Sequence, residues 1–147
     1  MRDGFITISD SHYDFDGQPA ENGEVTTTCR IGKDNGIIRI EYNESFESEF
    51  DASTVIMVEE KRVTMLRSGF INTSMVFENG CRHTCCYDTP VGQILIGVYT
   101  NAMYVSMSEN GGEIHLAFTV DSGGDFLSKN ELKITAEIKE DLNVGNS

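Results

Sequence analysis

The fold class is decided by the stretch Gly112-Glu113-Ile114-His115-Leu116-Ala117-Phe118-Thr119-Val120-Asp121. Its large apolar side chains stand at every second position, and mostly polar or small residues stand between them. Successive side chains of a β-strand point to opposite faces, so this alternation predicts a strand with one face in a core and the other towards solvent. Residues 132–138 repeat the pattern directly downstream, which predicts an antiparallel partner.

The same period of two extends outward from this stretch over most of the chain. Alternation and an abundance of β-branched and aromatic residues predict further strands at Gly4–Ser9, Glu24–Ile31, Gly36–Glu44, Thr54–Glu60, Arg62–Ser68, Ser74–Glu78, Cys81–Tyr87, Gln93–Thr100 and Ala102–Ser108. Turn signals rich in Asn and Gly separate many of them, as at Asn110-Gly111-Gly112. No segment of helical length has helical periodicity, and Asp10–Asn22 is expected to be a loop.

About ten short strands joined by tight turns predict an all-β protein, either an up-and-down barrel or a sandwich. A single closed antiparallel up-and-down β-barrel is favoured, because closure leaves no exposed sheet edge. Residues 1–147 are expected to form this one domain, with residues 1–3 and 143–147 frayed at its ends.

The charge balance excludes some classes of partner. The 24 acidic residues outnumber the 11 Lys and Arg residues and give a formal net charge of −13, which repels nucleic acid and anionic membrane surfaces. No secretory signal opens the chain, and no apolar run approaches the ~20 residues of a membrane helix. These features predict a cytoplasmic protein whose four cysteines are free thiols.

Several stretches, taken in order, resemble the YwiB-like family of small bacterial proteins. They are Tyr42-Asn43-Glu44, Val63-Thr64-Met65-Leu66-Arg67-Ser68-Gly69, Ser74-Met75-Val76-Phe77-Glu78-Asn79-Gly80, Tyr87-Asp88-Thr89-Pro90-Val91-Gly92, and Glu113-Ile114-His115-Leu116-Ala117-Phe118. The resemblance spans about Glu24 to Ile138 and departs from the family pattern at Phe118, where Tyr is expected. It implies a barrel similar to that of calycins, the group of lipocalins and fatty-acid-binding proteins. The family is a domain of unknown function, so the resemblance brings no activity, cofactor or catalytic residue.

No catalytic or metal-binding constellation stands out. The chain has three histidines and lacks a Gly-x-Ser-x-Gly elbow, a Gly-rich phosphate loop and a His-Glu-x-x-His motif, which favours a protein that is not an enzyme and needs no cofactor. Cys81, His83 and Cys85 alternate on one strand and could supply two ligands to a metal. A strand of half-buried residues without metal is the favoured interpretation, because closed zinc sites draw ligands from two places.

Two charged residues continue apolar faces. Glu44 follows Ile38, Ile40 and Tyr42 in phase, and Arg67 follows Val63 and Met65. Both charges are therefore predicted to point into the barrel, where a charge must be paired or hydrated.

Two interpretations of these inward charges stay open. In the structural one, Arg67 pairs with Glu44 or with backbone carbonyls and seals one end of the barrel. In the functional one, Arg67, Glu44 and Tyr42 form a site that binds a small, anionic or amphipathic molecule.

The alternative function is a filled-core barrel that acts as an interaction or assembly module without a ligand. Interior volume discriminates the two, because eight or more strands can enclose a small ligand unless side chains fill the space. The bulk available to fill it comes from Met57, Met65, Met75, Met103, Met107, Phe77, Phe118 and Phe126.

Overall fold

A computed structural model of the chain describes residues 1–13, 19–44 and 52–139, and its regular structure is entirely β. Its ten strands are β1 (Arg2–Tyr13), β2 (Pro19–Asp34), β3 (Ile37–Glu44), β4 (Ala52–Val58), β5 (Val63–Ser68), β6 (Asn72–Phe77), β7 (Arg82–Thr89), β8 (Gly92–Ser108), β9 (Gly111–Ser122) and β10 (Asp125–Ile138). Within these three ranges no helix is long and apolar enough to cross a membrane. The prediction of an all-β chain is confirmed.

The strands follow one another around a closed antiparallel barrel. Each pairs with its neighbours in sequence, and β1 pairs with β10 from Gly4–Ile138 to Tyr13–Lys129 to close the ring. The up-and-down barrel predicted from the sequence is therefore confirmed. The fraying expected at residues 1–3 is wrong for residues 2 and 3, because both pair with β2 and the Asp3 carbonyl accepts a hydrogen bond from the Lys139 amide at 2.9 Å. The expected frayed tail, 143–147, lies outside the described residues.

The largest differences from the expected strands lie in two regions, around residues 10–22 and around residues 92–108. The loop expected over Asp10–Asn22 is wrong at both ends, because β1 runs on to Tyr13 and β2 begins at Pro19. The inward positions of β1 are Gly4, Ile6 and Ile8 and then Asp10 and His12, so polar residues in the apolar phase concealed the strand. Residues 92–108, expected as two strands, form the single strand β8 with an irregularity between Thr100 and Ala102.

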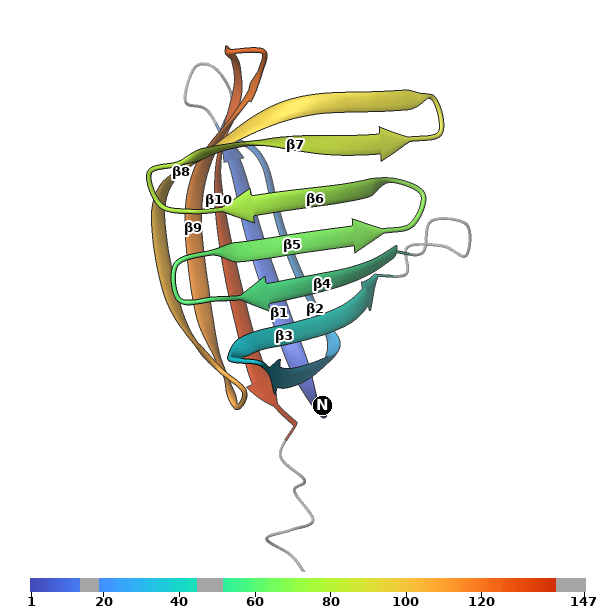
Figure 1. The fold of residues 1–147 in the computed structure, drawn as a ribbon, viewed down its shortest axis with the longest axis vertical. Coiled ribbons are helices and arrows are strands. Elements are labelled where there is room, and N and C mark those ends of the chain that lie inside the picture. The colour runs from blue at the N-terminus through green and yellow to red at the C-terminus, as the bar shows by residue number, and fades with distance from the viewer. Residues whose placement is uncertain (14–18, 45–51, 140–147) are drawn as a thin grey trace, which may run out of the picture.

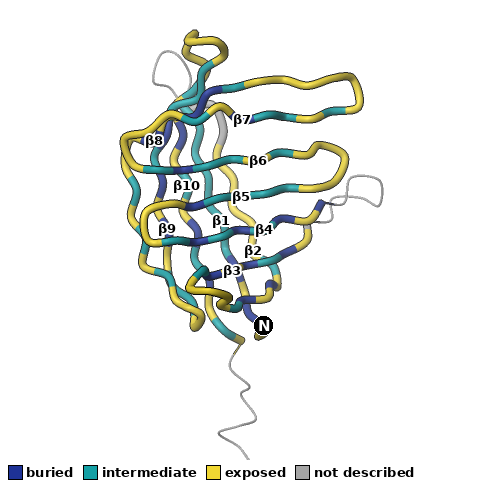
Figure 2. The backbone as a smooth tube through the Cα atoms, viewed as in Figure 1, coloured by how far each residue is buried: buried dark blue, intermediate teal, exposed yellow. Residues whose placement is uncertain are grey.

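The barrel is flattened into two layers whose strands cross at a steep angle (Figure 1). Strands β3 to β7 lie across the front, and β1, β9 and β10 run behind them. The long strands β2 and β8 belong to both layers, since one half of β8 pairs with β7 and the other with β9. The core fills the space where the layers meet, and the hairpin tips are exposed (Figure 2). Buried aliphatic side chains and the tilted ring pair Phe77–Phe118, with centroids 4.9 Å apart, make up this core.

The ladder between β6 and β7 is the shortest in the barrel. These strands pair only at Asn72–Asp88 and Thr73–Tyr87, whereas β5 and β6 pair at five positions. Beyond those two pairs, Cys85 forms a side-chain hydrogen bond with the Val76 backbone. The Gly80 amide donates to the Thr100 carbonyl and the Thr100 amide donates to the Cys81 carbonyl, which holds the turn against β8. The wall is therefore continuous, but its hydrogen bonding is thinnest between these two strands.

Candidate functional site

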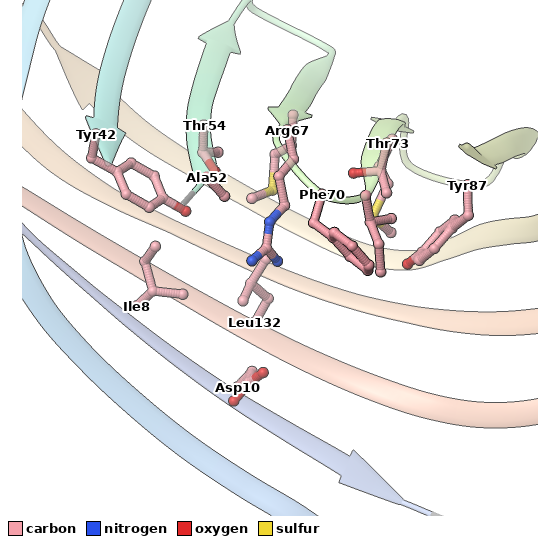
Figure 3. A pocket seen from close by; sticks show the side chains of 13 residues that line it. Ile8, Asp10, Tyr42, Ala52, Thr54, Arg67, Phe70, Thr73, Tyr87 and Leu132 are labelled. Carbon is pink, nitrogen blue, oxygen red and sulfur yellow. The ribbon is translucent and has the colours of Figure 1, made fainter. Parts of the chain in front are cut away.

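One end of the barrel encloses a cavity of about 550 Å³. Its apolar wall comes from six strands or turns, and the side chains are Ile8, Ala52, Met65, Phe70, Ile71, Met75 and Leu132. Its polar lining consists of Asp10, Tyr42, Thr54, Arg67, Thr73 and Tyr87. Figure 3 shows the Arg67 guanidinium directed from β5 across this space towards the wall that carries Leu132 and Asp10.

Five of the polar residues form a continuous row across five neighbouring strands. Strand register places Tyr42 opposite Thr54, Thr54 opposite Arg67, Arg67 opposite Thr73, and Thr73 opposite Tyr87. Directly opposed residues of antiparallel strands point to the same face with Cβ atoms about 5 Å apart. We call this set the polar row; it gives the otherwise apolar front wall a cation flanked by hydroxyl groups.

The residues proposed from the sequence fall at this end of the barrel to different extents. Arg67 and Tyr42 both line the cavity, and Tyr42 is 5% exposed. Glu44 is the last residue of β3 and its backbone pairs with Ala52, but its side chain lies outside the described part of the structure. The predicted approach of Arg67 to Glu44 stays a prediction.

Two residues of the polar row, Tyr87 and Thr54, have unusual surroundings. Burial raises the pKa of the Tyr87 phenol, the nearby Cys85 raises it further, and Arg67 opposes both effects. Tyr87 therefore stays protonated at neutral pH and can donate a hydrogen bond. The Thr54 hydroxyl is closed off from solvent and has no hydrogen-bond partner among the described residues.

The bulky side chains expected to fill the barrel do so only in part. Phe77 and Phe118 are buried, and Met65, Met75, Met103 and Met107 pack against the core. Two others do not fill the interior: Met57 lies on the opposite face of β4 from its buried residues, and Phe126 is 37% exposed. Space therefore remains at the end that carries the polar row.

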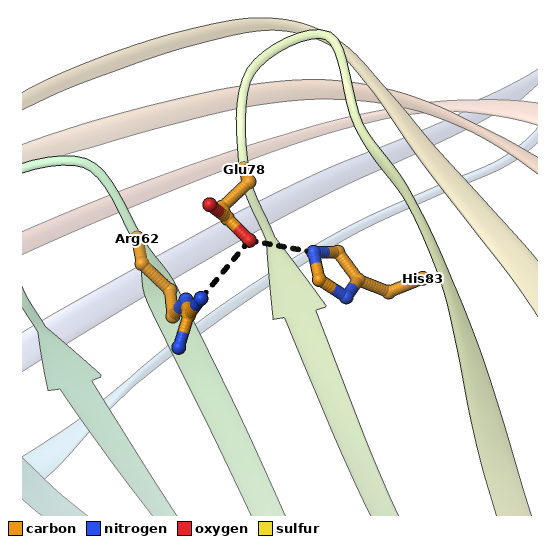
Figure 4. A network of polar contacts seen from close by, with 3 residues as sticks. All are labelled: Arg62, Glu78 and His83. Carbon is orange, nitrogen blue, oxygen red and sulfur yellow. Dashed lines mark hydrogen bonds and ion pairs between the residues drawn. The ribbon is translucent and has the colours of Figure 1, made fainter.

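The histidine and cysteine residues considered as metal ligands have other surroundings. The His83 ring bonds to the Glu78 carboxylate at 2.7 Å, and the same oxygen accepts a 3.2 Å bond from Arg62 (Figure 4). Cys81 is exposed, whereas Cys85 is buried, and burial raises the pKa of its thiol. All four cysteines are free thiols. In the described ranges no three His, Cys, Asp or Glu side chains are grouped to hold a metal ion.

Sequence reasoning did not assign four polar residues of the cavity lining to a site. Thr54, Thr73 and Tyr87 lie in the polar row, and Asp10 lies on the facing wall. Thr54 could have been found from the turns, because a hairpin that turns at residues 59–62 places it opposite Arg67. In the same way, a hairpin between β5 and β6 places Thr73 opposite Arg67. Asp10 could have been found by extending the phase of Ile6 and Ile8 by one more step.

Comparison with known proteins places the chain in a family. A search of curated proteins found no match. Among solved structures, the crystal structure of ywiB protein from Bacillus subtilis is similar, with a TM-score of 0.82 and 21% identity over 93% of this chain and 92% of that one. The likeness to that structure supports the fold. Residues 6–134 match the family described as Domain of unknown function (DUF1934). The chain therefore belongs to the DUF1934 family.

Proposed function

We propose that the barrel binds a small amphipathic molecule in its cavity and holds an anionic group of that molecule at Arg67, without catalysing a reaction. One observation carries the proposal: a guanidinium is directed into a cavity of about 550 Å³ whose wall is largely apolar. Ligand pockets commonly have volumes of about 300–1,000 Å³ and combine apolar walls with a few polar groups that fix orientation. The resemblance to a family whose barrel is similar to that of calycins supports the same function by analogy.

The polar row is suited to a carboxylate. A guanidinium can donate two parallel hydrogen bonds to the two oxygens of such a group. The hydroxyls of Thr73 and Tyr87 lie on the next two strands and supply further donors on one side of Arg67. Met65 and Met75 border the row and offer adaptable apolar contacts to the rest of the ligand.

The remaining expectations belong to the same proposal. Free thiols are suited to the cytoplasm, where we place the protein. The net charge of −13 argues against a nucleic-acid partner, because binding to phosphates depends on Lys and Arg that release counterions.

A second candidate function is an interaction module, and exposed apolar side chains support it. Phe70, Ile71, Val91, Ile94 and Leu95 are exposed on the β5–β6 turn and the β7–β8 hairpin. Sedimentation velocity separates the candidates, because a self-associating module sediments as a dimer or larger species. A Val91→Ser variant would then shift it towards the monomer.

Binding of dodecanoate, measured by isothermal titration calorimetry, tests the ligand proposal. We expect wild-type protein to bind this amphipathic carboxylate and Arg67→Met to bind it at least about tenfold more weakly, as for the loss of a charge-assisted hydrogen bond. Arg39→Met is the matched control, because Arg39 pairs with Glu41 on the outer face of β3. Equal affinity in the wild-type and Arg67→Met proteins would refute the assignment.

Thermal unfolding of the unliganded variants separates a binding role from a structural one. A binding residue in a cavity contributes little to apo stability, so Arg67→Met should keep or raise the Tm. If Arg67 instead seals the barrel through a buried ion pair, Arg67→Met should lower the free energy of unfolding by about 3–5 kcal/mol. Native mass spectrometry of freshly purified protein adds an independent test, because a bound small molecule adds a discrete mass.

A further inference from the structure

A second charge faces the cavity from the wall opposite Arg67. Asp10 lies on β1, and the barrel order places β2, β3 and β4 between β1 and β5 on the shorter way round. Figure 3 shows the Arg67 guanidinium pointing towards the wall from which Leu132 and Asp10 project. Arg67 and Asp10 are the two charged residues of the cavity lining among the described side chains.

The Asp10 side chain is 45% exposed, and its carboxylate has neighbours on β1 and β2. One oxygen lies 3.4 Å from Nε2 of His12, the next inward residue of β1. Gly23 of β2 is directly opposite Asp10 in the register. A Cβ atom on residue 23 would lie 2.8 Å from the other carboxylate oxygen, so the missing side chain leaves the room that this oxygen occupies. The site is therefore built by three residues on two strands.

Aliphatic side chains border both charges. Ile8 precedes Asp10 on the inner face of β1, Leu132 is the register partner of Asp10 on β10, and Met65 precedes Arg67 on the inner face of β5. A molecule in the cavity would therefore meet a cation, a carboxylate and the aliphatic side chains beside each of them.

We infer that the preferred ligand is a zwitterion, with a carboxylate held by Arg67, an ammonium group held by Asp10, and an aliphatic segment between them. This inference rests on the proposed function and narrows it to a class of amino acids or short peptides. Electrostatics over longer distances favour the same class. A protein with a net charge of −13 repels a monoanion as it approaches, whereas a zwitterion has no net charge to repel.

Matched probes test this inference. Calorimetry compares the ω-amino carboxylates 6-aminohexanoate, 8-aminooctanoate and 12-aminododecanoate with hexanoate, octanoate and dodecanoate. At the chain length that fits the cavity, we expect wild-type protein to bind the ω-amino acid about tenfold more tightly than the plain acid. Asp10→Asn should remove this preference and leave the affinity for the plain acid unchanged or increased.

Two further variants sharpen the result. Gly23→Ala, which crowds the Asp10 carboxylate, should reduce the preference in the same direction and gives a second measurement if Asp10→Asn folds poorly. Asp34→Asn removes the same charge at an exposed position at the end of β2 and should leave the preference intact.

The failures of the inference and of the proposed function are distinguishable. If dodecanoate binds through Arg67 but no ω-amino acid binds better than its plain counterpart, the zwitterion inference is wrong and the proposed function stands. A preference that survives in Asp10→Asn also overturns the inference. If none of the six probes binds, both proposals are wrong.

Discussion

Replacing Thr54 by valine should stabilise the unliganded barrel. Thr54 is 3% exposed, and its hydroxyl has no hydrogen-bond partner among the described residues. Valine has nearly the same shape as threonine, so the substitution removes the hydroxyl without opening a cavity. It also keeps the β-branched side chain that suits a strand.

The expected gain follows from the cost of burying an unsatisfied polar group. That cost is about 1–3 kcal/mol, and valine is relieved of it because it has no hydroxyl to desolvate. Taking the lower end of the range, the free energy of unfolding should rise by about 1 kcal/mol. For a domain of this size, that gain corresponds to an increase in Tm of about 3 °C.

The assay is thermal unfolding followed by circular dichroism, with urea unfolding as a second measurement. Thr100→Val is the matched comparison, because the Thr100 hydroxyl is also buried and unpaired within the described chain but does not line the cavity. Both variants should gain similar stability.

Loss of stability in Thr54→Val would refute this reasoning. It would mean that the hydroxyl has a partner in solution, such as an ordered water molecule that bridges it to the polar row. If only Thr100→Val gains stability, the Thr54 hydroxyl has such a partner and the Thr100 hydroxyl does not.

Three other predictions concern parts of the molecule away from the cavity. Burial and the nearby Asp3 raise the pKa of the Cys29 thiol to about 11. Ellman's reagent at pH 8 should therefore modify exposed Cys81 quickly and Cys29 only after unfolding. Rapid loss of all four thiols from native protein would contradict this prediction. The His83 hydrogen bond and then Arg62 lower the pKa of Glu78, so ionised Glu78 stabilises the fold above its unfolded pKa, and this stabilisation is lost as pH falls through the folded pKa. Glu78→Gln removes this titration and should reduce the decline in Tm below about pH 4.5. An unchanged decline would count against the prediction. Gly97→Ala should lower the Tm, because a Cβ atom at residue 97 would collide with the Arg82 guanidinium, which donates two hydrogen bonds to Asp121. If Gly97→Ala lowers the Tm equally in an Arg82→Ala background, this collision is not the cause.

The fold could be predicted from the sequence because its signal is local. Alternation of apolar and polar residues marks each strand, and short turns fix which strands pair. Ile114, Leu116 and Phe118 illustrate this, since all three are buried as their positions predict. The prediction failed at Asp10 and His12, where inward-facing polar residues interrupt the alternation.

The cavity could be predicted only in part, for a related physical reason. Arg67 stood out because a charge in an apolar phase is costly unless it is paired or wet, and Tyr42 shares the face of its buried neighbours. The threonines of the polar row did not stand out, because threonine is common on both faces of a strand. The volume of the cavity depends on how two crossed layers close around side chains, and no single segment of sequence specifies that.

Because β1 pairs with β10, the chain could begin at another turn of the barrel without loss of any strand pair. Strands at the two ends of the chain are neighbours, and a backbone hydrogen bond joins Lys139 to Asp3. A short linker between these ends, with a cut at the exposed residues Glu60 and Lys61, would preserve every strand pair. Only the order of assembly would change: β1–β10 would become a local hairpin, and β4–β5 would become the contact that spans the whole chain. Because folding slows as contacting residues lie farther apart in sequence, such circular permutants would identify the strand pair whose closure sets the folding rate.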